Sequence, residues 1–181
     1  MPTTRQATPA DAARMTELMV IMHDTIGGPH RRGPWIQACE EVTRDRLMND
    51  PALVAYVTEI EDSEIVAFAT GELRRRFPGP TAIAPIYGYG ITGGTDPDHR
   101  HRGYFKACWG AVIDHLVALG CERISIFSSE QAEPIHRKMG FERHDGWPVP
   151  MNLYVDARNG EPGGDSVGAG PLRGVDGEGS R

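Results

Sequence analysis

The chain has 181 residues, of which 39% are hydrophobic, enough for one domain with a real core. Its formal net charge of −6 excludes an overall basic nucleic-acid-binding chain and mildly favours cationic substrates. No apolar run approaches the roughly 20 residues of a membrane span. The first residues lack the pattern of a signal peptide, and three scattered cysteines predict neither disulfides nor a metal site. We therefore expect a cytoplasmic protein that binds neither nucleic acid nor membrane.

The apolar patterns predict a strand, two helices, three strands, a helix, a strand, a helix and a last strand. Meandering strands followed by a strand-helix-strand crossover indicate an α/β fold with a mixed sheet and helices on both faces. The expected strands are 3–7, 52–60, 64–73, 82–95, 123–127 and 151–155, and the expected helices begin near residues 9, 34, 103 and 132.

The end of the chain differs in composition from the rest. Residues 157–181 hold eight glycines and only three large aliphatic side chains. Such a segment buries too little apolar surface to offset the entropy of ordering it. We expect a domain over residues 1–156 and a disordered Gly-rich tail over 157–181.

The segment from Thr95 to Phe105 carries the main functional signal. A strand ends, a turn containing Pro97 follows, and a helix begins near Gly103. The first N–H groups of a helix lack internal partners and attract anions. Gly103 permits an unusual φ and a close approach of a phosphate, while Arg100 and Arg102 add donors suited to phosphate. On these residues alone, a phosphate site and a solvated basic turn are equally supported.

A second glycine pattern, Gly88 to Gly93, matches the GxGxxG dinucleotide motif. That motif requires a helix directly after the glycines. Here a turn at residues 94–97 follows instead, which argues against a nicotinamide cofactor. The glycines then indicate either a bulged strand or the close approach of a ligand.

The loop Arg100–Phe105, read as Arg-x-x-Gly-x-(Gly/Ala), resembles the pyrophosphate motif of the GNAT N-acetyltransferases. Residues 5–12 resemble the opening strand and helix of that family, and residues 129–141 resemble its late helix. Phe105 stands at a position that is small in the family, Ser129 where Asn is frequent, and His136 where Tyr is frequent.

The resemblance implies a GNAT fold over residues 1–156, with a central mixed, mostly antiparallel sheet of about seven strands and about four helices. It also implies acetyl-CoA as co-substrate and a bulge near Gly93–Thr95 that aims an N–H at the thioester oxygen. The residues that we expect to bind the co-substrate are Gly94, Thr95, Arg100, His101, Arg102, Gly103, Tyr104, Phe105 and Ser129.

Three residues are the catalytic candidates. His136, at the position of the family's Tyr, could donate a proton to the leaving thiolate, and the alternative is a structural histidine. Tyr89 stands where some members carry a base, and Glu72 is the nearest carboxylate on the preceding strand. His23 and His30 are further candidates. No covalent acyl-enzyme is expected, since no cysteine has readable partners.

We therefore expect an enzyme that transfers acetyl from acetyl-CoA to the amine of a small molecule by direct attack in a ternary complex. The alternatives are a non-catalytic GNAT-fold protein that binds acyl-CoA or another ligand, and a protein lysine or N-terminal acetyltransferase. The sequence leaves open whether the protein forms a homodimer. His99 and His101 are spaced like a metal pair, but nothing completes a site, so no metal is expected. Lys106 and Lys138 are the only lysines, and we interpret the excess of arginine as composition bias.

Overall fold

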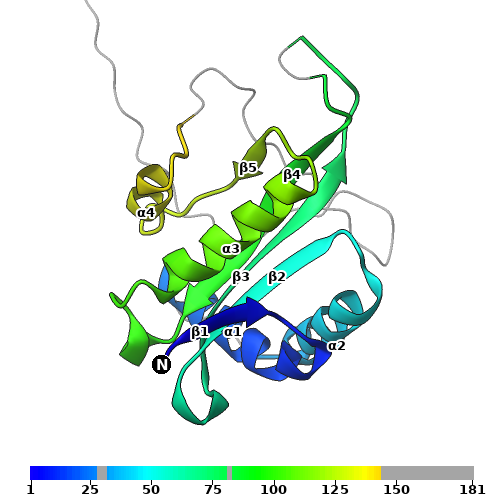
Figure 1. The fold of residues 1–181 in the computed structure, drawn as a ribbon. Helices are drawn as coiled ribbons and strands as arrows, with labels where there is room; N and C mark the ends of the chain where they lie inside the picture. The colour runs from blue at the N-terminus through cyan, green and yellow to red at the C-terminus, as the bar shows by residue number, and fades with distance from the viewer. Residues whose placement is uncertain (28–31, 81–82, 144–181) are drawn as a thin grey trace, which may run out of the picture. The chain divides into compact units, whose positions relative to one another are not determined.

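A computed structural model describes residues 1–27, 32–80 and 83–143 (Figure 1). Its elements follow the predicted order as far as residue 138. They are β1 (Thr3–Gln6), α1 (Ala12–Gly27), α2 (Pro34–Asn49), β2 (Leu53–Glu59), β3 (Ile65–Arg75), β4 (Ile86–Thr95), α3 (Tyr104–Ala118), β5 (Ile124–Ile126) and α4 (Glu133–Lys138), with short 3-10 turns η1 (Pro9–Asp11), η2 (Glu61–Ser63) and η3 (Pro97–His99). The strand expected at 151–155 and the tail at 157–181 lie outside the described residues.

The strands form one sheet in the order β1-β2-β3-β4-β5. The pairs from β1 to β4 are antiparallel, whereas β4 and β5 are parallel. A mixed, mostly antiparallel sheet is thus confirmed. The described residues contain five strands, so the expected number of about seven is not confirmed.

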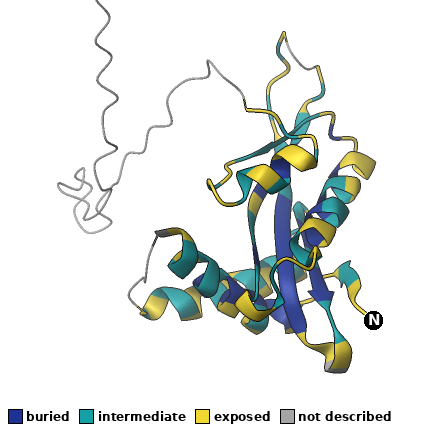
Figure 2. Cartoon of the chain, turned by 90° about the vertical axis from the view of Figure 1, so that its left-hand side faces the viewer, coloured by how far each residue is buried: buried dark blue, intermediate teal, exposed yellow. Residues whose placement is uncertain are grey.

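Helices α1 and α3 cover opposite faces of this sheet. Neighbouring residues of β2 belong to different cores: Val54 packs in the cluster of α3, whereas Ala55 and Val57 pack in the cluster of α1. This alternation is the two-residue period of a strand buried on both faces. Figure 2 shows the resulting stripe of buried strand residues between exposed helix surfaces. None of the helices in the described residues combines the length and apolarity that a membrane span requires.

A capping box forms the entry into the first helix. The Asp11 carboxylate accepts hydrogen bonds from the Thr8 backbone N–H at 2.7 Å and from the Thr8 hydroxyl at 3.0 Å. Arg5 donates to both Asp11 oxygens, at 2.8 and 3.0 Å. The turn η1 therefore ties β1 to the start of α1.

Three glycines allow α3 to lie close to the sheet. A Cβ on Gly71 would come within 2.9 Å of Val112, and one on Gly88 within 3.0 Å of Leu116, both residues of α3. A Cβ on Gly90 would come within 2.5 Å of the Trp109 ring. The glycines at the start of β4 are therefore required by helix packing and not by a ligand.

Candidate active site

The site begins where β4 and β5 part. Pairing between them runs from Gly88 with Ile124 to Gly90 with Ile126, where β5 ends. On the other edge of β4, Thr92 is opposite Thr70 and Gly90 is opposite Gly71, so Ile91 is an extra residue. Two residues facing one make a β-bulge.

The bulge was expected near Gly93–Thr95, and that position was wrong. It forms at Ile91, directly after the segment in which Gly88 and Gly90 are pressed under α3. Past this point β4 continues to Thr95 without pairing to β5. The backbone of residues 92–95 on that edge is therefore available to another partner.

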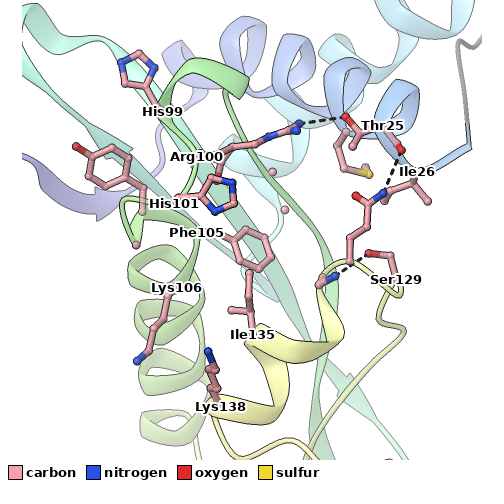
Figure 3. A pocket seen from close by; sticks show the side chains of 18 residues that line it. Thr25, Ile26, His99, Arg100, His101, Phe105, Lys106, Ser129, Ile135 and Lys138 are labelled. Atoms are coloured by element: carbon pink, nitrogen blue, oxygen red, sulfur yellow. Dashed lines mark hydrogen bonds between the residues drawn. The ribbon is translucent and has the colours of Figure 1, made fainter.

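A cavity of about 590 Å³ occupies this wedge (Figure 3). Four segments far apart in the sequence form its wall: the end of α1, the end of β4, the loop into α3, and the chain from Ser129 through α4. The lining residues are Met22, Thr25, Ile26, Gly93, Gly94, Thr95, His99, Arg100, His101, Gly103, Tyr104, Phe105, Lys106, Ser129, Gln131, Ala132, Ile135 and Lys138.

Asp96 anchors the turn that precedes the loop. One carboxylate oxygen accepts from the Asp98 N–H at 3.0 Å, and the other accepts from Arg14 of α1 at 2.7 Å. Burial raises the pKa of Asp96, but the hydrogen bonds from Arg14 and the Asp98 N–H, together with the charge of Arg14, outweigh it, and the pKa lies below the ordinary value. Arg14 also donates to the Ile65 carbonyl at 3.0 Å, which fixes the loop to both α1 and β3.

The loop itself reaches α3 through left-handed backbone. Gly103, the N-cap of α3, has a φ of +84°, which confirms that glycine is required there. His101 has a φ of +62°, a conformation that is uncommon for a residue with a side chain. The unpaired N–H groups of the first turn of α3 thus face a concave loop, as in anion sites at helix N-termini.

The two loop arginines have different surroundings. Arg100 lines the cavity and donates to the Thr25 hydroxyl at 3.1 Å. Gln131, on the opposite wall, makes a long hydrogen bond of 3.5 Å to the Thr25 carbonyl. Arg102 is exposed, donates to the Asp98 carbonyl at 3.4 Å, and does not line the cavity. Of these two arginines, only Arg100 therefore lines the cavity.

Phe105 occupies the cavity floor between β4 and α4. A Cβ on Gly93 would lie 3.0 Å from its ring, so Gly93 makes room for the larger residue. The ring also packs edge-on against Trp109, with centroids 6.2 Å apart, and against His136 at 5.8 Å. The bulky residue at this loop position is therefore accommodated by the glycine opposite.

His136 is buried beneath this floor and does not line the cavity. Its Nδ1 lies 2.8 Å from the Ser128 hydroxyl, and Trp109 and Phe141 enclose the ring. Burial lowers its pKa below the ordinary value. Its Nε2 is buried and has no hydrogen-bond partner in the part of the chain that the structure describes.

Glu72 and Tyr89 are cross-strand neighbours on β3 and β4, outside the cavity wall. Glu72 accepts from Arg46 at 2.6 Å and from Arg74, whose guanidinium stacks 3.5 Å over the Tyr89 ring. Burial raises the pKa of Glu72, but the two arginines outweigh it and the pKa lies below the ordinary value. Tyr89 precedes the bulge residue Ile91 by two positions, about 7 Å of strand.

Most of the predicted co-substrate residues meet at the cavity. All of them except Arg102 line it. Sequence reasoning missed Thr25 and Gln131, which only the tertiary fold brings to this site, and it also missed Lys106 and Lys138. For the lysines a signal existed, since they are the only two in the chain.

The remaining histidines have other surroundings. His23 packs edge-on against Trp35, with ring centroids 5.8 Å apart. His30 lies outside the described residues. His99 and His101 both line the cavity, but the described ranges contain no group of three side chains able to hold a metal ion.

Comparison with known proteins adds a family to this geometry. Residues 19–141 match the family described as "Acetyltransferase (GNAT) family". The chain is 31% identical over 149 residues to aminoglycoside N(6′)-acetyltransferase type 1 of Stenotrophomonas maltophilia, covering 78% of this chain and 86% of that protein.

Solved structures show the same fold. A predicted acetyltransferase from Clostridium acetobutylicum, in a structure with acetyl-CoA, superposes with a TM-score of 0.70 at 21% identity, covering 84% of this chain and 96% of that one. A GCN5-related N-acetyltransferase from Ralstonia eutropha JMP134 gives 0.68 at 20% identity, covering 83% and 99%. The chain belongs to the acetyltransferase (GNAT) family and is an N-acetyltransferase.

Proposed function

We propose that this enzyme transfers the acetyl group of acetyl-CoA to the primary amine of a small cationic molecule, by direct attack in a ternary complex. The observation that carries the proposal is the parting of β4 from β5 after Gly90, beside the N-terminus of α3. One cavity thereby joins an open strand edge to an anion site. Coenzyme A has matching chemistry, with amide groups in its pantetheine arm and a pyrophosphate beyond them.

The residues present fit this co-substrate. The Thr95 hydroxyl oxygen is buried in the cavity wall without a hydrogen-bond partner in the described part of the chain, which suits a polar ligand. The first N–H groups of α3 and the Arg100 guanidinium would hold the pyrophosphate. Gly93, Gly94 and Thr95 would hydrogen-bond to the pantetheine arm, and Ser129 would contact it from the opposite wall. When bound, acetyl-CoA supplies the activated acetyl thioester.

The acceptor is proposed from charge and from a relative. The chain carries 25 acidic against 19 basic residues, which favours a cationic acceptor. The Stenotrophomonas relative is named for the acetylation of aminoglycosides, which are polyamines of this kind. We therefore place aminoglycosides first among the amines to be tested.

Thiol release from acetyl-CoA, followed with a panel of aminoglycosides, simple amines, amino acids and peptides, tests the proposal. Release that depends on a small amine supports it. Release with peptides alone would instead identify a protein acetyltransferase. Tight coenzyme A binding without release for any acceptor would identify a non-catalytic binding protein.

The catalytic roles of His136, Tyr89 and Glu72 stay predictions. If His136 supplies the proton to the leaving thiolate, His136→Ala lowers turnover far more than it weakens coenzyme A binding, and unchanged turnover removes it from the mechanism. Glu72 is a weak base while both arginines hold it ionised. Glu72→Gln and Tyr89→Phe, compared through their pH–rate profiles, decide whether either side chain takes the proton of the amine.

A further inference from the structure

The only two lysines of the chain line the same cavity. Lys106 lies in the first turn of α3, and Lys138 is the last residue of α4. Figure 3 shows their side chains pointing toward one another from the two helices. The rings and methyl groups of Phe105 and Ile135 lie between this lysine pair and Arg100 in that view. The cavity therefore has a second cationic region, separate from the loop.

The charges around the lysine pair favour a bound anion. Neither lysine takes part in an ion pair within the described residues, although acidic residues outnumber basic ones in the chain. The carboxylate of Glu133, on the same helix as Lys138, is paired with Arg137 at 2.8 Å. Two ammonium groups that point into one space repel each other, and an anion between them makes the interaction attractive.

The order of groups along the cavity identifies the anion. In Figure 3, Arg100 lies at one end of the site and the lysine pair at the other, with Phe105 and Ile135 between them. Along the chain, Gly93 and Gly94 of β4 precede the loop of Arg100, which precedes Lys106. Coenzyme A has the same order: a pantetheine arm, a pyrophosphate, and an adenosine with a 3′-phosphate. A phosphate monoester carries a charge of about −1.5 to −2 near neutral pH. Lysine, a compact charge on a flexible stem, suits such a group at an open cavity mouth.

We propose that Lys106 and Lys138 form a second phosphate site that binds the 3′-phosphate of coenzyme A and so distinguishes coenzyme A from dephospho-coenzyme A. This rests on the proposed use of acetyl-CoA and adds a specificity determinant to it. The lysines would act on the affinity for the co-substrate and not on the acetyl-transfer step.

Calorimetric titration of the full chain with coenzyme A and with dephospho-coenzyme A tests the proposal. The unaltered enzyme is expected to bind coenzyme A about tenfold more tightly, as two exposed charge pairs would give. In Lys106→Ala/Lys138→Ala, the affinity for coenzyme A should fall to that for dephospho-coenzyme A, whose own affinity should not change. Arg137→Ala is the matched control, because Arg137 is a cation of α4 outside the cavity wall.

The outcomes separate the two proposals. If neither ligand binds the unaltered enzyme, the proposed function is wrong and this inference falls with it. If both ligands bind equally well, or if the double variant loses affinity for both to the same extent, the lysine pair does not bind the 3′-phosphate while the proposed function stands. Thermal unfolding of each variant checks that it is folded.

Amine labelling gives an independent measurement, because the N-terminal amine, Lys106 and Lys138 are the chain's only primary amines. Coenzyme A should slow the labelling of both lysines about tenfold by an amine-reactive reagent, and dephospho-coenzyme A should not. The N-terminal amine, labelled at a constant rate, is the internal control. Equal protection by inorganic phosphate at the same concentration would indicate a general anion site and overturn the assignment to the 3′-phosphate.

Discussion

The guanidinium of Arg100 donates to the hydroxyl of Thr25 across 3.1 Å and so joins the loop before α3 to the end of α1. The two residues are 75 positions apart, and both line the cavity. Arginine has five N–H donors, so Arg100 can keep this contact and still donate to a phosphate. A side chain held in this way is pre-positioned for the ligand.

Arg100→Ala is expected to weaken coenzyme A binding by about 10- to 100-fold, the range for a hydrogen bond to a charged group. Arg102→Ala is the matched control, because its side chain is exposed and outside the cavity wall. It should change the dissociation constant less than about threefold. Calorimetric titration measures both, and equal losses would show that the loop acts only through its total charge.

Asp96→Ala is expected to weaken coenzyme A binding several-fold although Asp96 does not line the cavity. The substitution removes the acceptor for Arg14 and for the Asp98 N–H, so the loop is less well ordered before the ligand arrives. Glu17→Ala is the control, since Glu17 is the other, exposed partner of Arg14. If Glu17→Ala causes the same loss, the position of Arg14 and not the loop anchor controls binding.

The free energy of unfolding is expected to decrease below about pH 6.5 through His136. Burial lowers its pKa in the folded chain, so the unfolded chain takes up this proton at a higher pH. The stabilisation that His136 contributes is therefore fully present above about pH 6.5. As the pH falls from there toward the folded-state pKa, the free energy of unfolding decreases by at most about 1.4 kcal/mol per pH unit. Urea unfolding of the enzyme and of His136→Gln between pH 8 and 5 measures this. An unchanged pH dependence in the variant would exclude His136 as the cause.

Gly90→Ala is expected to destabilise the fold by about 1–3 kcal/mol, because the added methyl group would overlap Ile126 and the buried Trp109 ring. Gly110→Ala is the opposite control. Gly110 lies inside α3 with nothing within 4 Å of the added atom, so alanine should stabilise the protein by up to about 1 kcal/mol. Thermal unfolding compares the two, and a neutral Gly90→Ala would mean that α3 moves away from the sheet without penalty.

Local signals in the sequence predicted much of the fold. The cap at Thr8 and Asp11, the left-handed glycine at Gly103 and the helix stop at Gly120, with a φ of +91°, each depend on residues close in sequence. A few neighbouring dihedral angles and hydrogen bonds determine such features, and Gly103 takes the left-handed φ that the sequence predicts. The predicted order of strand, loop and helix around Gly103 followed in the same way.

Long-range contacts were beyond the reach of such patterns. Nothing near Glu72 in the sequence indicates that Arg46, 26 residues earlier, will occupy its carboxylate. The burial of His136 depends on Phe105 and Trp109 from another helix, and the bulge at Ile91 depends on the packing of α3 over Gly90. Many residues of the cavity were therefore readable from the sequence, whereas the ionisation and exposure of the candidate catalytic groups were not.

Within the described residues, β4 pairs with β5 only as far as Gly90, so this edge of the sheet is unpaired from Ile91 to Thr95. An unpaired strand edge is a surface to which other chains can add. A donor molecule bound there would act as a temporary extra strand, and only the folded chain offers it that place. Mass action then links the folded fraction to the donor concentration. At a donor concentration a hundred times the dissociation constant, the free energy of unfolding rises by about 2.7 kcal/mol. The concentration of the donor in the cell would thereby set the folded fraction of this enzyme, as well as its rate of catalysis.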